Sequence, residues 1–424
     1  MPRHPDAPRS DDPWEGYRSG SAGYRRISAS VFLAGMATFA LLYTTQPLLP
    51  LLSREFDVSP AQSSLTVSLS TIGLGLAMLV AAPVSERFGR TTMMHVSLLG
   101  SSIVCALAAF APTWSTLLGL RLLLGVVLAG LPAVAMAYLT EELHGSAAAQ
   151  AAGLYIAGTA LGGMTGRLLA GLLAQLWDWR AAQLGMGGLG ILCAAAVLAL
   201  LPRSRRFTPA PPGLGEAVRS TRAILRDPAL LMLFGISLTA MGAQVGIYNT
   251  IGFRLEAPPY ALPVALASLV FLVYLGGSAA STIAGRWSSR VGRRTVAPVA
   301  AVVMLLGVVL SLAQPLWLVV VALAVSTAGF FALHGVASGW VPVRARLGRG
   351  GAAQASSLYL FAYYLGSSVF GTAAGSAWEA AGWAPVVALC GGLVVVALGL
   401  TLLLRRTHSL EPGGGTGPGP QTAG

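Results

Sequence analysis

The chain has 424 residues, of which 55% are hydrophobic and 10% are charged, and its mean hydropathy is +0.71. This composition leaves too little polar surface to cover a water-soluble globule of that length, so the chain is predicted to lie in a lipid bilayer. Its 27 basic residues, all arginine, outnumber 15 acidic ones and give a net charge of +12. Membrane orientation and contact with anionic lipid account for this excess, and we expect no nucleic-acid partner.

Twelve apolar runs are long enough for a membrane-spanning helix, which needs about 20 residues. They cover Ile27 to Leu49, Gln62 to Ala82, Met93 to Ala111, Trp114 to Tyr138, Ala148 to Leu173, Ala181 to Leu201, Ala229 to Gly252, Val264 to Ala284, Val296 to Ala313, Leu316 to Gly339, Gln354 to Ser376, and Ala384 to Leu404. An all-α membrane protein is therefore predicted. The even number of spans puts both chain ends on one side.

Arginine is concentrated in the connections on one side of these spans. The two tails, the central connection and the loops after the second, eighth and tenth spans hold most of it, whereas the opposite loops hold only Arg54, Arg180 and Arg254. Because cytoplasmic loops are enriched in arginine, both termini are predicted to be cytoplasmic.

Three segments lie outside the spans. Residues 1–26 and 405–424 are predicted to be disordered cytoplasmic tails, because they are too polar or too rich in glycine and proline to pack. Residues 202–228 are predicted to form a cytoplasmic linker between a bundle of six helices at 27–201 and a second one at 229–404.

Chemistry-bearing motifs are scarce. The first apolar run has full length and no small-residue cleavage site after it, so we expect no cleaved signal. Cys105, Cys193 and Cys390 each fall inside a span without metal or redox spacing, and no phosphate-binding motif occurs in this lysine-free chain. We expect no metal, no cofactor and no ATP-driven step.

The two halves repeat each other. "AQAAGLYIAGTALGG" (149–163) aligns with "AQASSLYLFAYYLGS" (353–367) at an offset of 204, which pairs Gly162 with Gly366. "PVSERFGRTTMM" (83–94) aligns with a later segment at an offset of 203, which pairs Arg87 with Arg290, Gly89 with Gly292, and Arg90 with Arg293.

This duplicated segment is also where a family resemblance lies. "APVSERFGRT" resembles the signature of the major facilitator superfamily, with Glu86 in place of the usual Asp, and "LLGLRLLLGVVLAG" resembles the family's Arg-x-x-x-Gly pattern at Arg121 and Gly125. The resemblance covers about residues 27–404. It implies the major facilitator fold of two pseudo-symmetric six-helix bundles and a monomeric transporter of small molecules.

Finer motifs indicate a direction of transport. The fifth span, "GLYIAGTALGGMTGRLLAG", is similar to the glycine-rich motif of the antiporter branches. "GGMTGR" and Tyr248 to Tyr260 resemble a bacterial inner-membrane efflux subgroup. Without the family resemblance, the glycines of the fifth span indicate only close helix packing.

The charged loop at Glu86, Arg87, Gly89 and Arg90 has two interpretations. It serves membrane topology alone, or Glu86 docks at the helix N-terminus near Ala353 and Gln354 and latches the cytoplasmic ends together when the cavity opens outward. We predict the latch. Gly89 is expected to supply a positive φ in a tight turn. The second copy, with Arg290, Gly292 and Arg293, lacks the acid and is expected to pair with Glu141 or Glu142.

Two arginines fall inside spans. For Arg121 we favour proton movement or substrate contact, as the family resemblance implies, over a structural role in capping carbonyls of neighbouring helices. Arg167 lies nearer the outer surface, and we expect it to snorkel toward that surface.

Candidate substrate contacts follow from the helices that line the cavity in this fold. Tyr43 and Gln46 are three residues apart and are expected to share a helix face just before Pro47. Mid-membrane amides and hydroxyls need partners, which makes further residues candidates. They are Gln244, Tyr248, Asn249, His334, Tyr359 and Tyr363.

Proton coupling has few candidates because no Asp or Glu falls in the middle of a span. His334 is the only histidine well inside one, and with Arg121 it is the predicted coupling group. A neutral histidine bonded across helices is the alternative, and Glu55 or Glu379 at span ends is another.

The sequence therefore predicts a multi-pass inner-membrane transporter that exports drugs or sugars in exchange for protons. The alternative is a facilitator or importer without proton coupling. A membrane enzyme or sensor is disfavoured, because the loops are short and no catalytic constellation is present.

Overall fold

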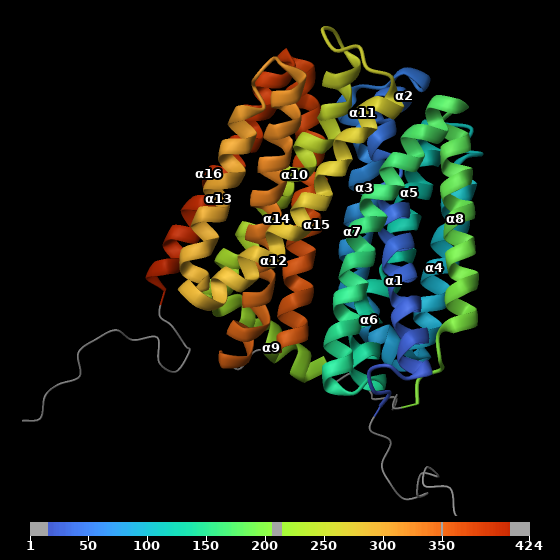
Figure 1. The fold of residues 1–424 in the computed structure, drawn as a ribbon, viewed down its shortest axis with the longest axis vertical. Helices are drawn as coiled ribbons and strands as arrows, with labels where there is room; N and C mark the ends of the chain where they lie inside the picture. Colours follow the sequence, from blue (N-terminus) through green and yellow to red (C-terminus); the bar gives the residue numbers. More distant parts are fainter. Residues whose placement is uncertain (1–15, 206–213, 349–350, 408–424) are drawn as a thin grey trace, which may run out of the picture.

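The structure is a computed structural model that describes residues 16–205, 214–348 and 351–407. Two bundles of long helices stand side by side (Figure 1). The first, here the N-terminal half, holds α1 (Ala22–Leu42), η1 (Gln46–Leu48), α2 (Leu49–Glu55), α3 (Pro60–Phe88), α4 (Arg90–Ala108), α5 (Trp114–Leu128), α6 (Gly130–Glu142), α7 (Gly145–Leu176) and α8 (Trp179–Leu200).

The C-terminal half repeats this plan. It holds α10 (Pro228–Glu256), α11 (Val264–Ser268), η2 (Leu269–Val273), α12 (Tyr274–Val291), α13 (Arg293–Leu310), α14 (Leu316–Leu347), α15 (Ala352–Ala381) and α16 (Trp383–Arg406). A short helix, α9 (Leu214–Arg226), lies in the linker between the halves. The all-α class and the two bundles are thus as predicted.

Membrane-crossing segments account for most of the described chain. Eleven helical segments among the described residues are long and apolar enough to cross a bilayer. The remaining predicted span is α15, which has 30 residues but carries several serines, tyrosines and glycines. It packs against α3 and α10, and Tyr359, Tyr364, Ser367 and Ser368 are buried.

Each repeat makes the same tight turn at one glycine. Gly89 separates α3 from α4 with φ +87°, and Gly292 separates α12 from α13 with φ +86°. Only glycine adopts this backbone region without strain. The positive φ predicted at Gly89 is confirmed. The predicted multi-residue loop is wrong, because both flanking helices continue through the charged residues to this single glycine.

The N-terminal segment is more ordered than predicted. α1 begins at Ala22, capped by the Ser21 hydroxyl, which accepts from the Tyr24 N–H. Tyr17 is held on the α6–α7 connection, where its N–H donates to the Glu142 carbonyl at 2.9 Å and its carbonyl accepts from the His144 N–H at 3.1 Å. Disorder over 16–26 is therefore wrong, since these backbone bonds fix the segment; residues 1–15 and 408–424 lie outside the described residues.

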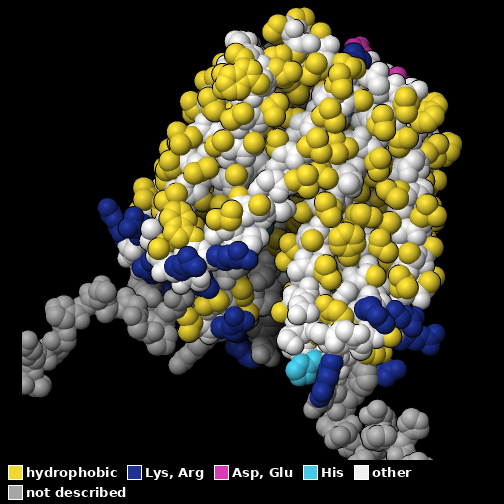
Figure 2. All heavy atoms as spheres, viewed as in Figure 1, with side chains coloured by type: hydrophobic (Ala, Val, Ile, Leu, Met, Phe, Trp, Pro, Cys, Tyr) yellow, Lys and Arg dark blue, Asp and Glu magenta, His cyan; other side chains and the backbone are white. Residues whose placement is uncertain are grey.

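The two ends of the bundles differ in charge. One end, called the arginine-rich end, contains both glycine turns and the start of α1, with Arg87, Arg90, Arg290, Arg293 and Arg405. Figure 2 shows arginine gathered there below a largely apolar surface. Leu192, Leu306 and Ile156 are 61–69% exposed in the middle of long helices, as expected for side chains that face lipid.

The halves touch at the other end, called the opposite end, where α2 ends and α10 ends. Across the seam, the Glu379 carboxylate accepts from the Ala61 N–H at 2.7 Å and Arg54 pairs with Glu256 at 2.9 Å. Deeper in, the Thr71 and Ser368 hydroxyls bond at 2.8 Å. At the arginine-rich end, Figure 2 shows a hollow between the halves. The structure is therefore closed at the opposite end and open at the arginine-rich end.

Candidate functional site

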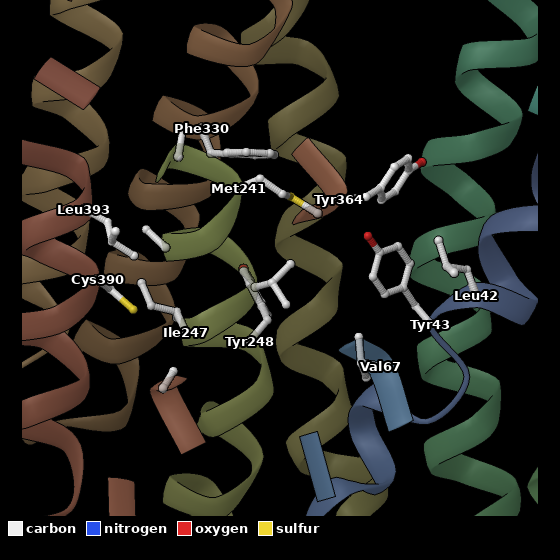
Figure 3. Packing of buried hydrophobic residues seen from close by; sticks show 14 of the residues in the cluster. Leu42, Tyr43, Val67, Met241, Ile247, Tyr248, Phe330, Tyr364, Cys390 and Leu393 are labelled. Carbon is white, nitrogen blue, oxygen red and sulfur yellow. The ribbon is translucent and has the colours of Figure 1, made fainter. Parts of the chain in front are cut away.

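The candidate site begins at a break in the first span. Pro47 and Pro50 have no N–H to donate, so a continuous α-helix cannot form there. α1 ends at Leu42, and Gln46 opens the 3₁₀ turn η1. The prediction that Tyr43 and Gln46 share one face of a helix is wrong for this reason, although both still contact Arg167. The surroundings of Arg167 between the two halves are called the pocket below. Figure 3 shows Tyr43 on this link with its hydroxyl toward the C-terminal half.

A relay of amides joins the two halves at this break. Arg167 Nε donates to Gln46 Oε1 at 2.6 Å, and Gln46 Nε2 donates to Asn249 Oδ1 at 2.8 Å. Asn249 Nδ2 then donates to the Gly371 carbonyl at 3.4 Å. Gln46 and Asn249 are at most 2% exposed. The relay runs from α7 through η1 to α10 and α15.

Arg167 itself lies in a cage of three aromatic rings. Its guanidinium carbon is 4.1 Å from the ring centre of Tyr43, 4.9 Å from Tyr274 and 5.1 Å from Phe271. The side chain is 2% exposed, and Nη1 donates to the Gly163 carbonyl. The expected snorkelling of Arg167 is wrong, because cation–π contacts and the relay hold it at the seam.

The seventh span contributes a second polar group. Tyr248 Oη and Thr327 Oγ1 are 2.7 Å apart, and Gln244 Nε2 donates to the same Thr327 oxygen at 3.3 Å. Gln244 Oε1 has no hydrogen-bond partner among the described residues. The Tyr248 ring contacts Phe271 and Tyr274, with centroids 5.4 and 5.1 Å apart. Gln244 and Tyr248 therefore adjoin the Arg167 cage.

His334 lies in an aromatic cluster further along the seam. Its Nδ1 is 3.0 Å from the Tyr359 hydroxyl, and its ring centroid is 4.9 Å from Tyr363 and 5.8 Å from Phe330. Phe330 packs on Phe331, which packs on Tyr274. A continuous aromatic wall thus connects His334 to the cage.

Arg121 is in a different place. It is fully buried, with Nε donating to the Thr66 carbonyl at 2.9 Å, Nη1 to Leu41 at 3.3 Å and Nη2 to Leu42 at 2.5 Å. The Leu41 and Leu42 carbonyls belong to the last turn of α1, where the break removes helical donors. In this conformation Arg121 therefore caps carbonyls of neighbouring helices, which is the structural role that the sequence analysis gave as the alternative.

The proposed latch is not assembled in this conformation. Glu86 accepts from Arg90 at 2.5 Å, and Arg90 also pairs with Glu141 at 3.2 Å. The N-terminus of α15 is instead met by the linker helix α9, where the Ser220 hydroxyl accepts from the Gly351 N–H at 2.8 Å. Arg87 and Arg290 are exposed.

The latch stays a prediction for the conformation with the arginine-rich end closed. Glu86→Gln should raise the labelling rate of a single cysteine placed at Ser356, near the start of α15, because the closed state loses its charge–dipole contact. The measurement is maleimide labelling in a variant that lacks the three native cysteines. Glu379→Gln, at the opposite end, is the matched control and should not raise labelling at Ser356. An unchanged rate in Glu86→Gln would contradict the latch.

Comparison with known proteins identifies the family. The sequence pattern of the Major Facilitator Superfamily matches residues 31–274. The chain is 40% identical over 390 residues to the uncharacterized MFS-type transporter YybF of Bacillus subtilis, covering 92% of this chain and 96% of that protein. It is also 40% identical over 393 residues to the inner membrane transport protein YnfM of Escherichia coli, with 92% and 94% covered. The chain belongs to the major facilitator superfamily and is a multi-pass membrane transporter.

Solved structures match the fold at low sequence identity. A bacterial homologue of the human lysosomal transporter Spinster, in an inward-facing and occupied conformation, aligns with a TM-score of 0.76 at 16% identity, over 92% of this chain and 98% of that one. A point mutant of the nucleoside transporter NupG aligns with a TM-score of 0.68 at 15% identity, over 89% and 99%. These matches concern the fold alone.

Proposed function

We propose that the protein exports small organic molecules, such as drugs or sugars, across the bacterial inner membrane in exchange for protons. Transport proceeds by alternating access, with the arginine-rich end and both termini in the cytoplasm. The observation that carries this proposal is the polar seam at Gln46, Asn249 and Arg167, which lies between two halves that touch at one end and part at the other.

The asymmetry of contacts supports an exchange of access. If the arginine-rich end closed and the relay at the opposite end broke, the pocket would become accessible from the other face of the membrane. The two halves could remain nearly rigid during this change. The sequence resemblance to efflux proteins favours export, and the similarity to the inner membrane transport protein YnfM favours the inner membrane.

Proton coupling rests on His334. Each described Asp and Glu lies at or near a helix end, so no described carboxylate lies at the pocket. His334 is the imidazole on the aromatic wall, beside the Tyr359 hydroxyl. A proton taken up there would alter the bond between α14 and α15.

The test uses proteoliposomes with an imposed pH gradient and radiolabelled chloramphenicol and L-arabinose as probes. Wild-type flux of a transported probe should rise at least tenfold with the gradient. His334→Ala should remove that rise when each flux is expressed relative to the variant's own gradient-free counterflow, so that an altered substrate contact is not mistaken for lost coupling. His95→Ala, a histidine on α4 away from the pocket, is the matched control and should keep the rise.

Two outcomes separate the alternatives. Flux that ignores the pH gradient in the wild type would make the protein a facilitator. Flux that depends on the gradient equally in wild type and His334→Ala would move coupling to another group, with Glu55 and Glu379 as the next candidates. Both acids lie at the opposite end, where Glu55 pairs with Arg180 at 3.0 Å.

A further inference from the structure

The charge of Arg167 has no counter-ion among the described residues. Its contacts are the Gln46 amide oxygen, the Gly163 carbonyl and three aromatic rings, and none of these carries a negative charge. A charged side chain in the middle of a membrane protein is costly and normally pairs with another charge or serves a ligand. This site therefore carries an uncompensated positive charge.

The guanidinium is also incompletely bonded. Nε and Nη1 donate to Gln46 and Gly163, whereas Nη2 makes no hydrogen bond to a described residue. Arginine presents its N–H groups as a planar fork that fits a carboxylate with two parallel bonds. Arg121, another buried arginine of this half, is bonded through all three of its nitrogens to carbonyls.

The surroundings of Arg167 suit the rest of a ligand. Tyr274 contacts Phe331 with ring centroids 5.6 Å apart, and the wall continues through Phe330 to His334. A molecule with its acid group at Arg167 would lay an apolar or aromatic body along this wall. A cationic molecule would instead meet an unopposed positive charge.

We propose that Arg167 recognises the carboxylate of the transported molecule, which makes the substrate class a small organic acid with an apolar or aromatic body. The proposal rests on the transport function proposed above, and it narrows the substrate class to acidic drug-like molecules and excludes sugars. A carboxylate is an ionised acceptor that can take two parallel bonds from the guanidinium fork, whereas Gln46 Oε1 is a neutral acceptor that takes one from Arg167 Nε, so the bound acid takes the place of Gln46 Oε1.

That exchange would connect binding to opening. Gln46 is the middle member of the relay from Arg167 to Asn249, and the relay is a polar tie across the closed end. When the acid displaces Gln46 from Arg167, the Gln46–Asn249 bond loses the polarising partner that orients it. Occupation of the pocket thus weakens the closure that must break for release.

The experiment compares ligands that share a skeleton and differ in charge. The purified full chain is titrated in detergent with benzoate, benzamide and benzylamine, and with indole-3-acetate, indole-3-acetamide and tryptamine, while its Tm is recorded. We expect half-saturation by an acid at a concentration at least tenfold lower than by its amide or amine. Absence of any acid preference in both series overturns the proposal.

Variants test whether Arg167 is responsible for the preference for acids over amides. Arg167→Gln should abolish the difference between acid and amide, and Arg167→Lys should keep part of it because the charge remains without the fork. Arg254→Gln is the matched control: this arginine is also buried and donates to the Ser311 and Ala313 carbonyls away from the seam, so the preference should persist. An acid preference that survives in Arg167→Gln overturns the proposal.

A third variant keeps the proposal testable if Arg167→Gln does not fold. Gln46→Ala keeps the cation and removes its competing acceptor, so acids should bind more tightly, by about tenfold, with no gain for amides. Weaker acid binding in this variant counts against the proposal. If a neutral or cationic probe is transported and acids are not preferred, only the proposed substrate class is refuted. An acid that binds as described but is never carried refutes the transport function instead.

Discussion

Gly162→Ala is expected to cost about 3 kcal/mol of stability, because a methyl group there would lie far inside van der Waals contact of the Met36 carbonyl. α7 packs along α1 through this glycine and its neighbours Gly158 and Gly166, which meet the α1 backbone at Phe32 and Ala40. Added volume must push the helices apart, since backbone atoms cannot rotate away. Loss of folded protein, measured as Tm and membrane yield, checks the prediction.

Two matched substitutions sharpen this test. Gly153 lies on the same helix with open space around it, so Gly153→Ala should leave Tm unchanged or raise it slightly. Gly366, the repeat partner of Gly162, faces the Leu238 carbonyl in the same way, and Gly366→Ala should be as harmful as Gly162→Ala. Equal Tm values for Gly153→Ala and Gly162→Ala would refute close packing at Gly162.

The fold was predictable because it depends on features that can be read from local stretches of the sequence. Apolar length set the spans, and the internal repeat at offsets of 203 and 204 set the two halves. The repeat extends to backbone detail, since Gly89 and Gly292 differ by 1° in φ. The same local evidence gave the close helix contact at Gly162. These features need no knowledge of which side chains meet across the seam.

Helix ends were less predictable, because hydropathy reports the lipid boundary and not the end of backbone hydrogen bonding. α3 continues past Glu86 and Arg87 to Phe88, and α1 starts before Ile27. Charged residues at the membrane surface cost little in a helix, so the change from apolar to charged sequence does not end it.

Many residues of the site could be predicted from residue type, but their arrangement around Arg167 could not. Gln46, Asn249, Tyr248 and His334 were predicted from polarity in mid-span; the first two bond across the seam, and the other two belong to the aromatic wall and its neighbours. Arg167 was misplaced because its expected span was cut short at Leu173, which set it close to a surface. Gly163, four residues earlier, was the available signal, since it shares a helix face with Arg167 and marks the side that faces protein.

Tyr274 and Phe271 were missed for a different reason. The eighth span was expected as one regular helix from Val264, whereas the structure places the 3₁₀ segment η2 at Leu269–Val273 between α11 and α12. The change in helical pitch alters which residues face the first half. Single-residue patterns do not reveal such a change.

Arg121→Leu is expected to destabilise the protein by about 3 kcal/mol and to abolish transport. Three carbonyls would lose their donors at about 1 to 3 kcal/mol each, against a gain of about 2.5 to 3.5 kcal/mol for no longer placing an arginine in the membrane. Two of these carbonyls, at Leu41 and Leu42, terminate α1. The break that presents Tyr43 and Gln46 to the pocket would therefore lose its support.

Arg121→Lys separates this structural role from the coupling role implied by the family resemblance. One ammonium group cannot reach the Thr66, Leu41 and Leu42 carbonyls in the geometry of the fork, so Tm should fall by about half as much as in Arg121→Leu. Transport per folded molecule should then keep its dependence on the pH gradient. If Arg121→Lys folds with wild-type Tm and loses only that dependence, Arg121 moves protons, and the carbonyl bonds of this conformation are a resting arrangement that breaks during the cycle.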